Sequence, residues 1–520
     1  MTLSVVVVGS GAAGMSAAVA AATSGADVTI LEAADHIGGT TAISGGGLWM
    51  PANPWAAANG IEDTVEAGVT YLKALQAGGG DALPAAAEAY VNEGLRITRT
   101  IEERTPIRWE HIRGFADYHT NLPGGVEDGR SLEMKPFQAS PEAHALVREN
   151  PYRMPPMTIA EEELPTPPDA EELARREAER VMARGCGLIA AFTDAALANN
   201  VSIRTSTRAT TLRIEKGIVT GVEAAGETFE GDVILASGGF ERNESLLASY
   251  LPGPFLGPAG PPTNRGDGLV MAQQAGARLA NMSDAWWVAT LHVPGETIDG
   301  APFNRMLFID ASRPGAIAVD QNGRRFVNES VNYYAFGREL SQRDPNTFAY
   351  LRAPSYIVMD SRRRRILPFA WIQPGRPDPD WLPKAGSIRE LADLIGVPAD
   401  ALEETVEHFN AMAAAGKDTD FARGETGYDV FANMGAALVP VSEPPFYALR
   451  MQPGGHGTKG GPAIDERARV LSRSGDPIPG LFAAGNASAH PFRRGFAGPG
   501  APIGAGVVFG WLAGETAAAG

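Results

Sequence analysis

The sequence predicts an α/β protein in which one domain is inserted into another, and three observations indicate this. First, a short β-branched strand over residues 4–8 runs into a glycine turn, a helix of small residues and a second strand. This order opens a doubly wound parallel sheet. Second, the sequence pattern changes over residues 282–444, where it predicts a mixture of strands, aromatic loops and helices. Third, the chain is again glycine-rich and apolar after residue 445.

The elements of the first predicted segment, residues 1–281, follow from hydrophobic periodicity. Residues 12–22 have the small, apolar composition of a buried helix, and residues 28–31 supply the second strand. The rest of the segment is predicted to contain helical stretches over residues 63–104 and 170–199, an irregular proline-rich stretch over 105–168, and strands near Ile203 and over 211–214, 219–222 and 233–235.

The second predicted segment, residues 282–444, mixes strands and helices as an α+β domain does. A strand is expected over residues 315–319, and helices over 387–394 and 401–414. The third segment, residues 445–520, ends in a predicted helix over 504–519. We expect residues 1–281 and 445–520 to complete one Rossmann-like domain.

Composition and charge argue against several classes of protein. The 520 residues carry a formal net charge of −17, so we expect no cationic surface that gathers nucleic acid or anionic lipid. Cys186 is the only cysteine, so no intrachain disulfide is possible, and a cytoplasmic location is favoured. Residues 495–514 are uncharged but contain seven glycines and two prolines, so we expect no membrane span.

The glycine turn after the first strand has the spacing of a dinucleotide-binding site. Residues 9–14 read Gly-Ser-Gly-Ala-Ala-Gly. In this pattern Gly9 allows the tight turn, Gly11 lets a pyrophosphate approach, and Gly14 lets the helix pack closely on the strand. The pyrophosphate would meet unpaired N–H groups at the helix N-terminus. A glycine turn without any ligand is the alternative.

Glu32, about twenty residues further on, indicates which dinucleotide is bound. A carboxylate at the end of the second strand accepts hydrogen bonds from ribose hydroxyls and repels a 2′-phosphate, which disfavours NADP. A second glycine-rich cluster over residues 38–47 would serve a longer dinucleotide, so we predict non-covalent FAD. Turns at 480–486 and 498–504 would bring backbone N–H groups to the flavin ring, unless they are only sheet-to-helix turns. The predicted cofactor-binding residues are Gly9, Gly11, Ala12, Ala13, Gly14, Glu32, Gly39, Thr40, Thr41, Ser44, Gly45, Gly46, Gly238, Gly485, Asn486, Pro502 and Ile503.

Patterns of other enzyme classes are missing from the sequence. It contains no Gly-x-Ser-x-Gly elbow, no His-Glu-x-x-His, and no spacing of cysteine and histidine that suits zinc. We therefore predict no metal site and no hydrolase.

Several motifs taken together resemble one family. They are the segments 9–14 and 38–47, Gly-Phe-Ala-Asp-Tyr at 114–118, Pro-Gly-Gly at 123–125, Asp-Ala-Trp-Trp at 284–287, Arg-Phe-Val-Asn-Glu-Ser at 325–330, Gly-Thr-Lys-Gly-Gly at 457–461 and Gly-Asn-Ala-Ser-Ala at 485–489. Nearly end to end, the chain resembles the flavoprotein 3-ketosteroid Δ1-dehydrogenases, within the wider fumarate-reductase/succinate-dehydrogenase flavoprotein group. The resemblance implies a Rossmann-like FAD-binding domain with an inserted α+β substrate (cap) domain, and an active site between them.

The resemblance also implies a reaction. An α-proton is removed beside a ring ketone while a β-hydride passes to flavin N5, which leaves a conjugated C=C bond; a quinone, O2 or another external acceptor then takes the electrons. By position Tyr333 is similar to the proton-abstracting tyrosine of the family, and Tyr118 to the tyrosine that assists it. Because free tyrosine has a pKa of about 10, we expect a relay between the two. Without the resemblance, either residue would read as a core aromatic.

One position departs from the family pattern. The family binds the ketone oxygen with a glycine N–H, which maps to Gly500, and with a tyrosine hydroxyl, whose position is Phe496 here. Phe115 is a further expected substrate contact. We hypothesise that Arg493 or Arg494 enters the pocket and polarises a carbonyl or binds a carboxylate, with a surface salt bridge as the alternative. A carboxylate would make the substrate an oxo-cyclohexane carboxylate, as in similar 4-oxocyclohexanecarboxylate dehydrogenases, instead of a 3-oxosteroid.

Two other functions stay open. A fumarate-reductase-like or ene-reductase activity would use Arg494 as proton donor to an activated C=C bond. A flavoprotein that has lost turnover would only bind a ring ligand, with Phe496 as the trace of the loss.

Overall fold

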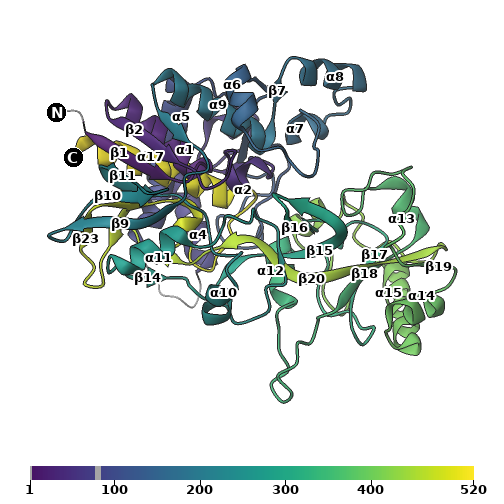
Figure 1. Cartoon of the computed structure of the whole chain (residues 1–520). Coiled ribbons are helices and arrows are strands. Elements are labelled where there is room, and N and C mark those ends of the chain that lie inside the picture. Colours follow the sequence, from purple (N-terminus) through teal and green to yellow (C-terminus); the bar gives the residue numbers. More distant parts are fainter. Residues whose placement is uncertain (1–2, 77–82) are drawn as a thin grey trace.

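The computed structural model describes residues 3–76 and 83–520 of the chain. Two parts are visible in Figure 1. The main part contains the first strand and the last helix, which lie side by side although they come from opposite ends of the chain. The smaller part, which we call the cap, is built around strands from residues 285–458 and extends from one side of the main part.

The centre of the main part is a six-stranded sheet in the order β22-β23-β12-β1-β2-β8. All neighbouring pairs are parallel except β22 and β23. The two strands after the cap join the same sheet as the first strand, so both ends of the chain complete one doubly wound sheet. The strands are β1 (Ser4–Val8), β2 (Asp27–Leu31), β8 (Ser202–Arg204), β12 (Asp232–Leu235), β22 (Arg469–Leu471) and β23 (Pro477–Ala483).

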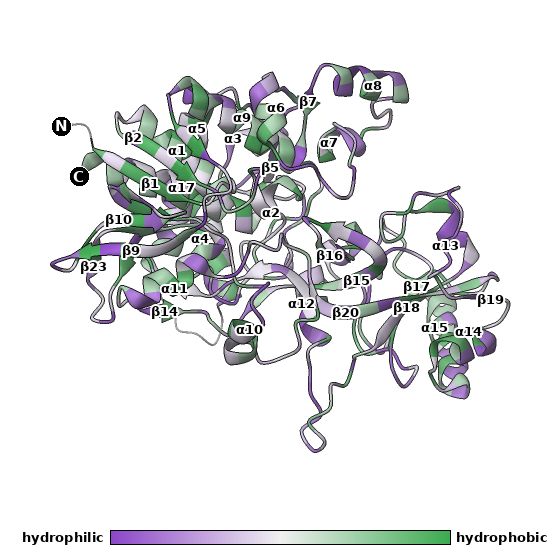
Figure 2. Ribbon diagram, viewed as in Figure 1, coloured by the Kyte–Doolittle hydropathy of each residue, from purple (hydrophilic) through white to green (hydrophobic). Residues whose placement is uncertain are grey.

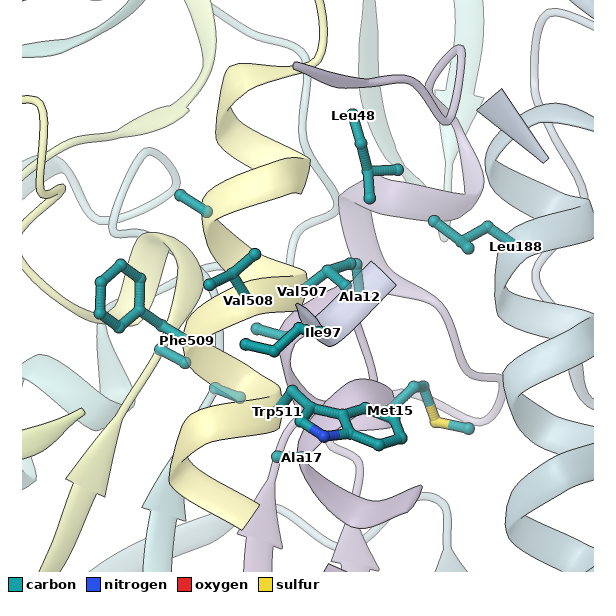
Figure 3. Packing of buried hydrophobic residues seen from close by; sticks show 14 of the residues in the cluster. Ala12, Met15, Ala17, Leu48, Ile97, Leu188, Val507, Val508, Phe509 and Trp511 are labelled. Carbon is teal, nitrogen blue, oxygen red and sulfur yellow. The ribbon is translucent and has the colours of Figure 1, made fainter. Parts of the chain in front are cut away.

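The last helix, α17 (Ala501–Ala519), packs along the first helix, α1 (Ala12–Thr23). Both are apolar over most of their surface (Figure 2). Trp511 and the valines of α17 fill the space beside α1 (Figure 3). A Cβ at Gly510 would lie 2.2 Å from the carbonyl oxygen of Ala13, so a glycine is needed for the two backbones to approach this closely. Among the described residues, no helix is both long enough and apolar enough to cross a membrane.

The predicted helix over residues 170–199 is wrong, because the structure has two helices there, α8 (Ala170–Ala178) and α9 (Arg184–Ala198), with the short strand β7 (Val181–Met182) between them. Arg180 and Arg184 have φ values of 58° and 56°, and this left-handed backbone cannot continue an α-helix. Periodicity alone does not reveal such a break, because the residues on both sides remain helix formers.

Further elements surround this sheet. The segment predicted to be helical over residues 63–104 forms α4 (Val65–Leu75) and α5 (Ala85–Arg104), and residues 77–82 lie outside the described residues. An antiparallel sheet consists of β9 (Ala209–Glu215), β10 (Ile218–Ala224) and β11 (Glu227–Glu230). The short elements of the main part are α2 (Gly39–Ala42), β3 (Leu48–Trp49), α3 (Pro54–Ala57), β4 (Trp109–His111), β5 (Ser131–Met134), β6 (Phe137–Gln138), α6 (Pro141–Leu146), α7 (Ile159–Glu162), α10 (Glu244–Tyr250), α11 (Asp267–Gln274), β14 (Leu279–Ala280), β21 (Gly461–Pro462) and the 3₁₀ turn η1 (Gly485–Ala487).

The cap contains a seven-stranded sheet with the path β16-β15-β20-β18-β17. Its long strands β15 and β20 pair antiparallel, and β13 and β19 add to β20. The strands are β13 (Gly257–Pro258), β15 (Ala285–Ile298), β16 (Ala301–Met306), β17 (Ala316–Asp320), β18 (Ser355–Met359), β19 (Lys384–Ala385) and β20 (Phe446–Thr458). The helices are α12 (Tyr333–Glu339), α13 (Ser361–Ile366), α14 (Ile388–Ile395), α15 (Ala399–Ala415) and α16 (Gly427–Ala432).

The division of the chain after residues 281 and 444 stays a prediction, and strand β20 bears on it. Residues 446–458 pair with β15 on one side and with β18 on the other, so they occupy the middle of the cap sheet. The cap sheet therefore includes β20, which lies in the predicted third segment, residues 445–520, that was expected to complete the first domain.

Candidate active site

A cavity of about 570 Å³ is lined by residues of both the main part and the cap. Its glycine side is formed by residues 8–13, 39–41, 43–47 and 485–486. Its tyrosine side includes Tyr118, Tyr333 and Tyr428. Of the residues predicted from the sequence, all line the cavity except Gly14, Phe496, Arg493 and Arg494.

Three glycines of the turn 9–14 have different surroundings. Gly9 has a φ of 106°, and a Cβ there would lie 2.4 Å from the carbonyl oxygen of Ala236. A Cβ at Gly14 would lie 1.9 Å from the carbonyl oxygen of Gly9, so these two glycines serve close packing. A Cβ at Gly11 would meet only the hydroxyl of Thr41, at 3.7 Å, and would otherwise project into the cavity. Gly11 therefore keeps space open for a ligand.

The first turn of α1 presents hydrogen-bond donors to this space. The N–H of Ala12 donates to the Thr41 hydroxyl at 3.1 Å. Helix N-termini leave N–H groups without intrahelical partners and carry the positive end of the helix dipole. Gly11, Ala12 and Ala13 all line the cavity, so the turn fits a pyrophosphate group.

The carboxylate of Glu32 lies at the end of β2, where it is buried and lines the cavity. One of its oxygens, Oε2, accepts hydrogen bonds from the N–H of Ser10 at 3.1 Å and from its hydroxyl at 2.5 Å. The other, Oε1, accepts from the N–H of Ala34 at 2.9 Å. A carboxylate has about four acceptor positions, so these contacts hold Glu32 in place and leave capacity for a ribose hydroxyl.

The second glycine cluster extends the same side of the cavity. The hydroxyl of Ser44 donates to the carbonyl oxygen of Thr41 at 2.7 Å, which closes the turn after α2. The hydroxyl of Thr40 accepts from the side chain of Asn264 at 2.9 Å. The small and hydroxyl-bearing residues of this side, together with the free space at Gly11, fit a dinucleotide longer than NAD.

The two predicted tyrosines meet on the tyrosine side. Their rings lie 5.5 Å apart at 76°, and the two hydroxyls act on each other's pKa. Burial raises the pKa of Tyr333 above its ordinary value, and the hydrogen bond from Tyr118 opposes this rise. Burial and the neighbouring tyrosines raise the pKa of Tyr118 well above its ordinary value. Both phenols are therefore neutral at neutral pH, and Tyr333 is the one whose phenolate receives a hydrogen bond.

Different segments hold the two tyrosines. Tyr333 is the first residue of α12, and the side chain of Asn332 caps this helix by accepting from the N–H of Ala335 at 3.0 Å. The N–H of Tyr118 donates to the carbonyl oxygen of Ala497 at 3.1 Å. This contact ties the loop of Tyr118 to the loop that leads into α17.

A buried ion network holds the loop that carries Tyr118. Arg130, fully buried, donates to Asp117 at 2.5 Å and to Asp63 at 2.6 and 2.7 Å. Asp117 also accepts from the indole N–H of Trp49 at 2.7 Å. Because removing one partner of a buried ion pair is costly, this network fixes the position of Tyr118.

Gly500 is the residue before α17 and has a φ of 87°. A Cβ at this position would lie 2.4 Å from the carbonyl carbon of Gly47, so only glycine fits here. Its carbonyl oxygen accepts from the N–H of Gly504 at 2.8 Å, whereas its own N–H makes no hydrogen bond to any of the residues that the structure describes. A free N–H at the cavity wall suits a carbonyl oxygen of a ligand.

Phe496 does not line the cavity but lies behind the tyrosines. Its ring is 4.8 Å from the rings of Tyr118 and Trp286 and 5.6 Å from that of Tyr333. Phe496 was predicted as a substrate contact, and the structure places its ring against both tyrosine rings and outside the residues that line the cavity. Phe115, in contrast, lines the cavity, with its ring 5.1 Å from that of Phe431.

Lys459 holds the loop on which Phe496 lies. Its ammonium group donates to the carbonyl oxygen of Gly495 at 3.1 Å and lies 3.5 Å from Asp284. The same group lies 4.1 Å from the ring centre of Tyr334. Burial lowers the pKa of Lys459 to about 8. The motifs at 284–287 and 457–461 therefore meet here and support the active-site loop.

The side chains of Arg493 and Arg494 are exposed and do not line the cavity. The hypothesis that one of them binds the substrate inside the pocket stays untested, and the structure places both side chains outside the cavity. The loop turns at Arg493, which has a φ of 51°, and this turn directs both residues to the surface. Sequence proximity to Phe496 did not reveal that the chain reverses between them.

Several cavity residues were missed by sequence reasoning, among them Arg313, Tyr428 and His456. Burial and, secondarily, the charge of Lys459 lower the pKa of His456 to about 4, so its ring is neutral at neutral pH. The ring of Tyr428 lies 5.2 Å from that of Tyr118. Arg313 and Tyr428 belong to no short motif, so no local sequence signal marks them, whereas His456 directly precedes the motif at 457–461.

A doubly wound sheet with a glycine turn that opens on a cavity, closed on its other side by a cap with paired tyrosines, defines an FAD-dependent oxidoreductase. The chain belongs to the family described as FAD binding domain, which matches residues 4–503. The predictions of FAD and of this fold class are confirmed.

Named relatives match over almost the whole chain. The 4-oxocyclohexanecarboxylate 2-dehydrogenase of Sinomonas cyclohexanicum is 38% identical over 99% of this chain and 93% of its own length. The 3-oxosteroid 1-dehydrogenase of Mycobacterium tuberculosis is 35% identical over 98% of this chain and 97% of its own length. The predicted resemblance to these dehydrogenases is therefore confirmed.

A solved structure of a dehydrogenase is similar to this chain over its whole length. The 3-ketosteroid Δ1-dehydrogenase of Sterolibacterium denitrificans, in complex with 1,4-androstadiene-3,17-dione, superposes with a TM-score of 0.91 at 31% identity. The match covers 100% of this chain and 99% of that one.

Proposed function

We propose that the protein introduces a C=C bond α,β to the carbonyl of a cyclic ketone. The observation that supports this proposal is that Tyr118 and Tyr333, with rings 5.5 Å apart, and the free N–H of Gly500 line one cavity. Relatives named for the dehydrogenation of 4-oxocyclohexanecarboxylate and of 3-oxosteroids support it.

Tyr333 removes the α-proton in this proposal. Its pKa is raised by burial, so the phenolate is scarce at neutral pH, and the residue needs help to accept a proton. Tyr118 provides that help, because its hydroxyl stabilises the phenolate of Tyr333 through their hydrogen bond. The tyrosine pair acts as a relay in which the proton of Tyr333 is shared with Tyr118.

The N–H of Gly500 stabilises the oxygen of the ketone. Negative charge develops on this oxygen when the α-proton leaves, and a fixed donor in a cavity without bulk water stabilises that charge. With phenylalanine at 496, the second donor that the resemblance implies is missing, and the Gly500 N–H carries this role in the chain as it stands.

The glycine side would hold FAD without a covalent bond through Gly11, Thr41 and Glu32. When bound, FAD supplies the acceptor for the hydride that leaves the β-carbon, and a quinone, O2 or another external acceptor then takes the electrons.

To test the proposal, the purified flavoprotein is mixed with saturated ring ketones under anaerobic conditions, and the absorbance of the flavin is recorded. We expect bleaching by at least one ring ketone, and turnover lower by about 10²–10⁴-fold in Tyr333→Phe, as for loss of a general base. Tyr356→Phe is the matched control, because Tyr356 is a buried tyrosine of the cap outside the cavity. Full turnover in Tyr333→Phe would contradict the proposal.

The alternative, reduction of an activated C=C bond, required Arg494 as proton donor. This side chain is exposed and outside the cavity, so no observation favours the alternative. The same experiment distinguishes dehydrogenation from reduction. The flavin of a dehydrogenase is bleached by the saturated ketone, whereas the reduced flavin of a reductase is reoxidised by the unsaturated ring compound.

A further inference from the structure

The tyrosine side of the cavity contains a cation that the proposed mechanism does not use. Arg313 lies in the loop between β16 and β17, is partly buried, and lines the cavity. Its Nη1 donates to the carbonyl oxygen of Ala432 at 3.2 Å. This is the one hydrogen bond of its side chain to the described residues, so the edge formed by Nε and Nη2 is open.

The charge of Arg313 has no close partner. Within residues 3–76 and 83–520, no carboxylate lies within 4 Å of it. Asp310, Glu162 and Glu163 are the carboxylates that act on it from further away, all three at the cavity wall. Burial lowers the pKa of Arg313, and these carboxylates oppose this effect.

A second guanidinium acts on the same carboxylate. Arg363 is 1% exposed, and its Nε and Nη1 have no hydrogen-bond partner among the described residues. The carboxylate of Asp310 accepts from the N–H of Ala370 at 2.6 Å and interacts with the charges of both arginines. Asp310 therefore interacts with both guanidiniums and does not serve Arg313 alone.

Helix α16 connects Arg313 with the tyrosines. Ala432, to which Arg313 donates, is the last residue of this helix, and Tyr428 lies four residues earlier. Side chains four residues apart are separated by about 5–6 Å. The charge of Arg313 also acts on Tyr428, whose ring touches that of Tyr118. Arg313 and the tyrosines therefore line the same cavity, and α16 links the hydrogen-bond partner of Arg313 to Tyr428.

We propose that Arg313 binds a carboxylate carried by the substrate, so that the enzyme prefers a small cyclic keto acid to a neutral ring ketone. The inference rests on the function proposed above and assigns its substrate class. A guanidinium and a carboxylate match as two parallel N–H···O bonds, and Nε with Nη2 is one of the edges that form them. No carboxylate of the described residues forms an ion pair with Arg313, so a substrate carboxylate would be its direct partner.

The first test measures binding without any reaction. Cyclohexanecarboxylate, which has no ketone, is titrated into the flavoprotein by calorimetry. We expect Arg313→Gln to weaken its binding by about tenfold to a hundredfold, as for loss of charge-assisted hydrogen bonds. Arg313→Lys should restore part of the affinity, since it keeps the charge but not the planar fork. Arg494→Ala is the matched control, and it should bind as the unchanged protein does.

The second test compares kcat/KM for 4-oxocyclohexanecarboxylate and for 4-methylcyclohexanone, which lacks the charge. We expect Arg313→Gln to lower kcat/KM for the acid by a similar factor and to leave that for the neutral ketone unchanged. Equal losses for both ketones, or unchanged carboxylate binding in Arg313→Gln, would overturn the assignment. The carbonyl oxygen of Ala432 keeps its contact with the Ser312 hydroxyl at 3.2 Å, so we expect the variant to fold.

Failure of the proposed function gives a different result. In that case neither ketone bleaches the flavin of the unchanged protein, whereas loss of cyclohexanecarboxylate binding in Arg313→Gln still supports the assignment of Arg313.

Discussion

The glycine side and the tyrosine side of the cavity differ in which atoms face the ligand. On the glycine side these are backbone N–H groups and small residues from the segments 9–13, 39–41 and 43–47. On the tyrosine side they are large side chains from separate loops and helices, such as Tyr118 from the main part and Tyr333 from the cap.

This difference affects what each side tolerates. Glycines that pack backbone against backbone leave no room for even one methyl group, as at Gly14. Side chains on the tyrosine side are supported by others, for example by Arg130 and Asp117, so one of them can change without a change in the fold. The cofactor side should therefore respond to substitution with loss of folding or of FAD, and the tyrosine side with loss of chemistry or specificity.

The largest expected effect compares two glycines of one helix turn. In Gly14→Ala the new Cβ would lie 1.9 Å from the carbonyl oxygen of Gly9, so we expect a loss of about 3 kcal/mol or more and no retained flavin. In Gly11→Ala the new Cβ meets only Thr41 at 3.7 Å, so the fold should persist while FAD affinity falls roughly 5- to 150-fold. The thermal midpoint of each variant measures its stability, and its visible absorbance measures how much flavin it retains. Equal destabilisation by the two substitutions would remove the distinction between packing and ligand-facing glycines.

Tyr118→Phe tests whether the tyrosine side fails in chemistry alone. We expect turnover to fall by about 10²-fold, at the lower end of general acid–base effects, because Tyr333 remains. Flavin content and thermal midpoint should match those of the unchanged protein. A loss of flavin in this variant would mean that the two sides are not independent.

The pH dependence of turnover sharpens the same point. The pKa of Tyr333 is raised, so the fraction present as the base grows about tenfold per pH unit below that pKa, and turnover should rise with pH. The hydrogen bond from Tyr118 opposes the rise of this pKa, so its removal in Tyr118→Phe should move the profile to higher pH. Steady-state rates over a pH series measure the shift. A profile that falls with increasing pH would contradict a tyrosine base.

The smallest expected effect is on the loop behind the tyrosines. Arg493→Ala removes an exposed side chain that does not line the cavity, so KM for an oxo acid should not change. Steady-state kinetics measure KM for the oxo acid in Arg493→Ala and in Arg313→Gln, and the two values are compared. If KM for the oxo acid rose in Arg493→Ala but not in Arg313→Gln, the substrate carboxylate would bind at the loop of Arg493, as the sequence suggested.

Sequence reasoning located the glycine side and part of the tyrosine side. The turn 9–14 and the cluster 38–47 are contiguous, so their spacing reflects their geometry. The pairing of Tyr118 and Tyr333, 215 positions apart, was accessible only through resemblance to a family, and the structure brings their rings to 5.5 Å. Arg313 was not found, because it belongs to no motif.

The amino-acid sequence by itself determined the doubly wound sheet, the glycine turn and the preference for FAD, because each depends on residues close together in the chain. The tertiary structure alone decided that β20 crosses the middle of the cap sheet, that Arg493 and Arg494 face outward, and that Arg313 faces the cavity. The physical reason is that these outcomes depend on how distant segments pack and where a loop reverses, which composition and local spacing do not encode.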